Sequence, residues 1–166
     1  MTGAMAENQN TEAGREVLRL VAAHPELFAL GNHSYTHPDF TTLGATAMRT
    51  ELDRTEAAIG RIVATSPRPF FRPPFGVQNA AVVSGVAAAG YPLTVMWDID
   101  TIDWRPESDG GPTAADIVAK VRANARGGSI VLMHLGGYNT LDALPGILAA
   151  LREAGLTPAT LSEMVR

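Results

Sequence analysis

Strand-like and helix-like segments alternate about five times along this chain, in units of roughly thirty residues. Short apolar runs predict strands at Leu27–Leu30, Phe70–Arg72, Leu93–Trp97 and Ser129–Met133. Periodic or capped segments predict helices at Thr11–Ala23, Thr42–Ile59, Asn79–Ala89, Thr113–Ala125 and Leu141–Leu151, and Thr160 is expected to cap a short terminal helix. This alternation is typical of βαβ units around a parallel sheet, so the sequence predicts a single α/β domain over residues 1–166.

Composition excludes several classes of function. The chain has 166 residues, a formal net charge of -4 and no cysteine. Mild acidity argues against a nucleic-acid partner, which would need clustered Lys and Arg. Thiolate metal sites, disulfides and cysteine nucleophiles are excluded. No apolar stretch reaches membrane-spanning length, so we expect no membrane span.

Two of the four histidines, His33 and His37, lie four residues apart after the first predicted strand. One helical turn would place both imidazoles on one side, where they can bind one metal ion. The simpler alternative is a capping or surface pair. Two imidazoles make a weak site, and a carboxylate would complete a face with open positions for water.

Other polar residues also stand at predicted strand ends. Arg72 closes the second strand, Asp100 and Asp103 follow the third, and His134 closes the fourth. Catalytic groups of barrel-like α/β folds gather at the C-terminal ends of strands. Each residue also has a structural explanation: a buried histidine satisfied by backbone, an arginine paired to a surface acid, or an aspartate that caps a helix.

Four segments together resemble the polysaccharide deacetylases (carbohydrate esterase family 4, the NodB-homology domain). These segments are His33-Ser34-Tyr35-Thr36-His37, Arg72-Pro73-Pro74-Phe75-Gly76, Asp100-Thr101-Ile102-Asp103-Trp104 and Leu132-Met133-His134. The second usually has Tyr where Phe75 stands. Their order and spacing fit the family, and the resemblance runs from about Thr2 to the end of the chain. It implies a distorted (β/α) barrel.

The resemblance also implies a role for each residue. His33 and His37 would be two of three ligands of a divalent metal, with zinc as the best-suited ion, although cobalt or nickel would bind similarly. His134 would be the general acid, with Asp103 hydrogen-bonded to it and favouring its protonated form, and Arg72 would orient the catalytic carboxylate. The backbone N–H of Phe75 would help to bind the oxyanion. Trp104 and Leu132 would line the acetate pocket.

One family motif is missing. Thr-Phe-Asp-Asp-Gly supplies the base and the third ligand in the family, but this chain contains no Asp-Asp pair. Thr2 to Asn8 resembles the segment that follows the family's second strand. We therefore expect an N-terminally truncated domain that lacks one or two strands, an incomplete barrel, poor activity of the chain alone, and homo-oligomers formed through open strand edges.

The leading hypothesis is thus a metal-dependent hydrolase that deacetylates N-acetylglucosamine-containing polysaccharides or other acetylated glycans and oligosaccharides. A second is a non-catalytic glycan-binding remnant of the same fold. A third is an unrelated metal hydrolase that recruits Asp39 or Asp100 as a ligand. Met1–Asn10 has no signal pattern, so the chain as written would stay in the cytoplasm, whereas the family acts mostly outside it.

Overall fold

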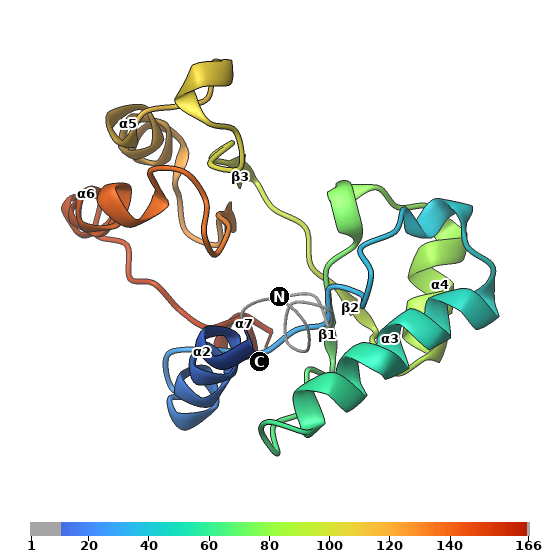
Figure 1. The fold of residues 1–166 in the computed structure, drawn as a ribbon. Helices are drawn as coiled ribbons and strands as arrows, with labels where there is room; N and C mark the ends of the chain where they lie inside the picture. The colour runs from blue at the N-terminus through green and yellow to red at the C-terminus, as the bar shows by residue number, and fades with distance from the viewer. Residues whose placement is uncertain (1–10, 166) are drawn as a thin grey trace. The chain divides into compact units, whose positions relative to one another are not determined.

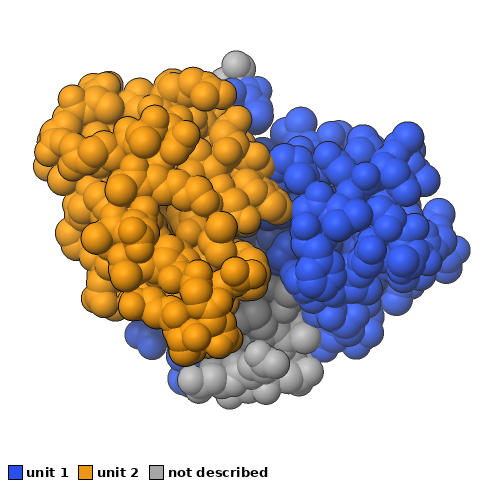
Figure 2. Space-filling view, turned by 90° about the horizontal axis from the view of Figure 1, so that it is seen from above, with its two compact units in different colours: residues 1–96, 160–166 blue, residues 97–159 orange. Residues whose placement is uncertain are grey.

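Helices and very short parallel strands alternate in the computed structural model, which describes residues 11–165 (Figure 1). Contacts divide the chain into two units, residues 1–96 with 160–166 and residues 97–159 (Figure 2). The histidine pair belongs to the first unit, and Asp103 and His134 belong to the second. The segment Thr2–Asn8, used above for the family resemblance, lies outside the described residues.

Within residues 11–165, the first unit contains four α-helices, two single-turn helices and two strands. They are α2 (Thr11–Ala23), η1 (Phe40–Thr42), α3 (Ala45–Gly60), β1 (Phe70–Phe71), η2 (Pro74–Gly76), α4 (Ala80–Ala88), β2 (Leu93–Thr94) and α7 (Leu161–Met164). Strands β1 and β2 are parallel, with Phe70 opposite Leu93. Helices α3 and α4 pack together over a core that includes Phe71, Leu52 and Val86.

The second unit contains β3 (Ile99–Asp100), η3 (Glu107–Asp109), α5 (Ala114–Asn124), β4 (Val131–Leu132) and α6 (Thr140–Glu153). Strands β3 and β4 are also parallel, with Ile99 opposite Val131 and Asp100 opposite Leu132. Helices α5 and α6 pack against each other through Ile117, Val121 and Ile147, which are almost fully buried. This pairing of strand ends places Asp103 beside the residues that follow Leu132.

The two predicted caps, Asn79 and Thr160, are confirmed, and Thr113 is a third cap that was not predicted from the sequence. The Asn79 side chain accepts a hydrogen bond from the backbone N–H of Val82, and Thr113 and Thr160 each form a complete capping box. Each bond satisfies a backbone donor that the first turn of the helix leaves unpaired. The predicted helix at Thr11–Ala23 is confirmed with the same bounds.

The predicted strand at Leu27–Leu30 is wrong. The backbone N–H groups of Leu27 and Phe28 both donate to the His24 carbonyl, so the chain turns after His24, and both apolar side chains are exposed. The extended pairing comes later, as a single parallel bridge between Asn32 and Phe71. The other predicted strands exist but keep only two ladder residues each.

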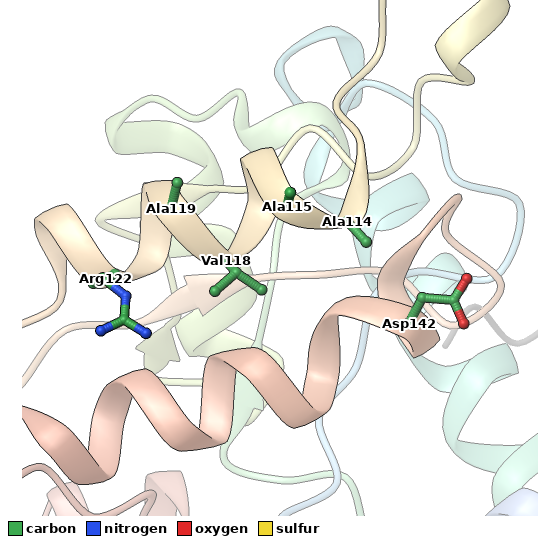
Figure 3. A pocket seen from close by; sticks show the side chains of 6 residues that line it. All are labelled: Ala114, Ala115, Val118, Ala119, Arg122 and Asp142. Atoms are coloured by element: carbon green, nitrogen blue, oxygen red, sulfur yellow. The ribbon is translucent and has the colours of Figure 1, made fainter.

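No helix among residues 11–165 is long and apolar enough to span a bilayer. An open groove of about 400 Å³ lies between α5 and α6 and is lined by Ala114, Ala115, Val118, Ala119, Arg122 and Asp142 (Figure 3). None of these lining residues is a predicted site residue.

Candidate active site

The His33 and His37 rings converge, but the connection between them is a loop and not the helical turn that the spacing predicts. Their Nε2 atoms are 3.1 Å apart, and the rings meet edge to face with centroids 4.8 Å apart. Ser34 and His37 have the left-handed φ values of 65° and 62°. Non-glycine residues rarely adopt this conformation, which costs on the order of 1–2 kcal/mol each. The strained backbone therefore brings the two imidazoles together.

The buried side chain of Asn32 holds this loop in place through three hydrogen bonds. Its side-chain oxygen accepts from the backbone N–H of Ser34 at 3.0 Å, and its amide donates to the Leu52 carbonyl and to the Tyr91 hydroxyl. The Ser34 hydroxyl in turn accepts from the backbone N–H of His37 at 3.0 Å. The loop is thus tied to helix α3 and to Tyr91, which lies two residues before β2.

The hydrogen bonds of His33 assign its tautomer. Its Nδ1 lies 2.7 Å from the Arg72 carbonyl oxygen, which can only accept, so Nδ1 carries the proton. In the neutral ring Nε2 then keeps its lone pair and faces His37. Burial lowers the pKa of His33 to about 4, because the interior disfavours the charged ring. His33 is therefore held in the form that binds metals.

Donor chemistry and geometry both fit a divalent metal at this pair. Two nitrogens bound to one tetrahedral zinc would be about 3.4 Å apart, close to the 3.1 Å between the Nε2 atoms. Within residues 11–165 no group of three or more His, Asp or Glu is placed to hold a metal. The two carboxylates considered as alternative ligands make other hydrogen bonds. Asp39 caps η1 by accepting from Thr41, and Asp100 accepts from the Ile102 N–H.

Arg72 and Phe75 lie next to the pair. The Arg72 backbone N–H donates to the Asn32 carbonyl, and its guanidinium reaches the Val95 carbonyl at 3.4 Å. Burial lowers the pKa of Arg72. The Phe75 ring packs edge to face on His37, with centroids 4.6 Å apart. Phe75 also has a left-handed φ of 59°, and 65% of it is exposed.

In the second unit, Asp103 is the centre of a hydrogen-bond cluster. Oδ1 accepts from His134 Nδ1 at 2.7 Å, while Oδ2 accepts from the His134 backbone N–H at 2.8 Å and from the Thr140 hydroxyl at 2.6 Å. The Asp103 carbonyl accepts from the Tyr138 N–H. The loop from His134 to Thr140 therefore wraps around one buried carboxylate.

The environment of Asp103 favours its ionised form. Burial by itself raises the pKa of this carboxyl, but the hydrogen bonds from Thr140 and His134 outweigh burial, and the net pKa lies below its usual value. A side chain at Gly137 would come within 2.4 Å of Asp103 Oδ2, so the loop needs a glycine there. The carboxylate is a fixed negative partner for the His134 ring.

The two predicted pocket residues of this unit differ in exposure. Leu132 is buried and its carbonyl accepts from the Thr101 hydroxyl at 2.8 Å, whereas 51% of Trp104 is exposed. The Arg105 guanidinium lies 5.2 Å from the Trp104 ring centroid. Trp104 is thus not part of the core, because half of the residue faces solvent.

The structure brings the predicted residues together as two groups, one in each unit. His33, His37, Arg72 and Phe75 form the first group, and Asp103 and His134 form the second. Sequence reasoning missed the residues that hold these groups in place, namely Asn32, Glu51, Gly137 and Thr140. Asn32 is adjacent to His33 and was the easiest to suspect. Glu51 and Thr140 act across long stretches of sequence and carry no local signal.

Comparison with known proteins identifies the family of the chain. A family model for polysaccharide deacetylase matches residues 1–94. The bifunctional xylanase/xylan deacetylase of Cellvibrio japonicus is 38% identical over 132 residues, covering 78% of this chain and 19% of that protein. The peptidoglycan-N-acetylglucosamine deacetylase of Bacillus cereus is 29% identical over 160 residues, covering 94% of this chain and 55% of that protein.

A solved structure shows the same fold. A family 4 carbohydrate esterase pseudoenzyme from Bacillus anthracis matches with a TM-score of 0.82 and 27% identity, over 99% of this chain and 53% of that chain. The chain thus spans between 19% and 55% of the length of these proteins. The chain belongs to the polysaccharide deacetylase family, carbohydrate esterase family 4.

Proposed function

We propose that this chain carries most of a metal-dependent deacetylase site that acts on N-acetylglucosamine-containing polysaccharides or other acetylated glycans. The observation that carries the proposal is the convergence of two Nε2 atoms, 3.1 Å apart, in a loop with left-handed backbone at Ser34 and His37. Strain of this kind persists where surrounding contacts maintain it, and it clusters at functional sites. Relatives that remove acetyl groups from xylan and peptidoglycan support the substrate class.

The proposed metal is divalent, with zinc as the best match to two imidazoles. A bound ion would polarise the acetyl carbonyl and lower the pKa of a water molecule. His33 and His37 would hold it through Nε2, because the Arg72 carbonyl keeps the proton of His33 on Nδ1. The backbone N–H of Phe75 would donate to the oxyanion, a role that needs no particular side chain.

His134 would protonate the departing amine. Amines leave poorly unless they are protonated, and the Asp103 carboxylate binds Nδ1 of the ring, so Nε2 is the nitrogen that would face the substrate. Trp104 and Leu132 would line the acetate pocket. In this proposal Arg72 orients the catalytic carboxylate, which the 166 residues do not contain in the family's Asp-Asp form.

Because this carboxylate is missing, we propose that the chain by itself is a poor catalyst. We also propose that the chain forms an incomplete barrel-type domain. Acetate release from N-acetylglucosamine oligomers with added zinc tests this. Slow release that increases with zinc and with added formate, a small carboxylate able to act as a base, and that disappears in His134→Ala would support the proposal. Rapid release without formate would refute the claim of poor activity.

A non-catalytic glycan-binding module is the second candidate. Its support is the lack of an Asp-Asp pair together with the exposed aromatic residues Trp104 and Tyr138, which are 51% and 52% exposed and offer ring faces to sugars. This candidate predicts that oligosaccharides perturb the Trp104 and Tyr138 resonances while acetate release stays at the His134→Ala background. That combined outcome would replace the hydrolase proposal.

A further inference from the structure

Glu51 on helix α3 binds the two residues at the middle of the loop between His33 and His37. Its Oε2 accepts from the backbone N–H groups of Tyr35 at 2.9 Å and Thr36 at 2.7 Å. Its Oε1 accepts from the Thr36 hydroxyl at 2.9 Å. A single carboxylate therefore satisfies three donors of the Tyr35–Thr36 turn. It comes from helix α3, which begins at Ala45.

This turn is where the loop needs support. Ser34 and His37 have φ values of 65° and 62°, and Tyr35 and Thr36 lie between these two left-handed residues. Hydrogen bonds to an ionised acceptor are shorter and stronger than neutral ones, so the carboxylate opposes relaxation of the turn. The Tyr35 ring is also held on α3, with the Arg54 guanidinium 3.8 Å from its centroid.

Glu51 does not serve as a metal ligand itself. Both of its oxygens are occupied by donors of the turn, and no grouping of three His, Asp or Glu placed for a metal occurs between residues 11 and 165. Its effect on a bound ion would be indirect, through the distance and angle between the two imidazoles. Groups of this kind commonly change metal affinity by about 10–100-fold.

We propose that Glu51 is a positioning residue that sets the affinity of the His33–His37 pair for a divalent cation. The inference rests on the metal site of the proposed function. In the free protein the Glu51 carboxylate holds the Tyr35–Thr36 turn, so the two Nε2 atoms converge before the ion arrives. The ordering cost of the loop is then met during folding and not during binding.

The test compares zinc affinity, measured by calorimetry, among matched variants. Glu51→Gln keeps the shape of the side chain but removes one acceptor and the charge, and we expect the dissociation constant to rise about 10–100-fold. Thr36→Val removes only the hydroxyl donor and is expected to raise it a few-fold. Asp53→Asn, on the same helix, removes the same charge from an exposed side chain and should leave it within twofold.

A second readout separates this inference from the proposed function. In the metal-free protein the Tyr35 and Thr36 amides should be protected from hydrogen exchange, and Glu51→Gln should speed their exchange at least about tenfold while Asp53→Asn does not. If the wild type binds no zinc yet the exchange pattern holds, the metal site and the effect of Glu51 on metal affinity are both refuted, and only the support of the Tyr35–Thr36 turn by Glu51 stands. Unchanged zinc affinity and unchanged exchange in folded Glu51→Gln would overturn the inference. If Glu51→Gln does not fold, Thr36→Val decides by the same two measurements.

Discussion

His134 Nδ1 lies 2.7 Å from Oδ1 of Asp103, a residue with no solvent exposure, while 43% of the His134 side chain remains exposed. A buried carboxylate thus holds one edge of an accessible imidazole. The fixed carboxylate sets the orientation of the ring, as the general-acid role proposed for His134 requires. We expect the same contact to affect how this unit responds to mutation and pH.

Asp103→Asn should destabilise the second unit by about 2–4 kcal/mol, because the amide cannot accept from all the donors that now surround Oδ1 and Oδ2. Both tryptophans, Trp97 and Trp104, belong to this unit, so fluorescence-detected urea unfolding reports on it selectively. A loss below about 0.5 kcal/mol would mean that the cluster contributes little to stability.

The stability difference between wild type and Asp103→Asn should also depend on pH. The pKa of Asp103 is lower in the folded chain than its ordinary value of 3.8. The stabilisation is therefore fully present above that ordinary value and is lost as pH falls below it toward the folded pKa. Urea titrations at pH 6 and pH 3 should show that the difference in free energy of unfolding between wild type and Asp103→Asn is smaller at pH 3. An equal difference at both pH values would contradict the lowered pKa of Asp103.

Thr140→Val should remove one hydrogen bond to the Asp103 carboxylate with little change in side-chain volume. It removes the hydroxyl that lies 2.6 Å from Oδ2 and leaves a buried carboxylate oxygen short of one donor. We expect a loss of about 1–3 kcal/mol in the tryptophan-detected transition. Thr140→Ser keeps the donor and serves as the control, and equal losses in both variants would point to packing instead of the hydrogen bond.

Removing either imidazole of the pair should lower zinc affinity by on the order of 100-fold, since the remaining ring binds alone. His33→Ala and His37→Ala are compared by calorimetry with His24→Ala, which removes an exposed histidine that is paired with Glu26. His24→Ala should bind as the wild type does. Equal zinc binding by all three variants would place the ion elsewhere.

The short parallel ladders should pair with other copies of the chain. Among residues 11–165 each ladder contains only two strands, so backbone groups remain on the outer edges of β2 and β4. Sedimentation velocity should therefore show association that increases with concentration. Leu93→Lys places a charge on the β2 edge and should reduce it. A monomer at all concentrations of the wild type would reject this prediction.

Much of the local structure could be predicted from sequence. The caps Asn79 and Thr160 start helices as predicted, because a cap depends on a side chain and backbone donors two or three residues away. The strand prediction at Leu27–Leu30 failed for the opposite reason. Apolar composition alone does not show whether neighbouring backbone is available, and there the chain turns on His24 instead.

The sequence by itself determined which side chains are present to do the chemistry: His33 and His37 four residues apart, Arg72 before two prolines, and Asp103 and His134 at strand ends. Only the tertiary structure decided how they are held. The Glu51 carboxylate on α3, the Thr140 hydroxyl on α6 and the amide of Asn32 all make contacts between segments that are distant in sequence. Because such contacts form only when separate elements pack, no local pattern of residues encodes them.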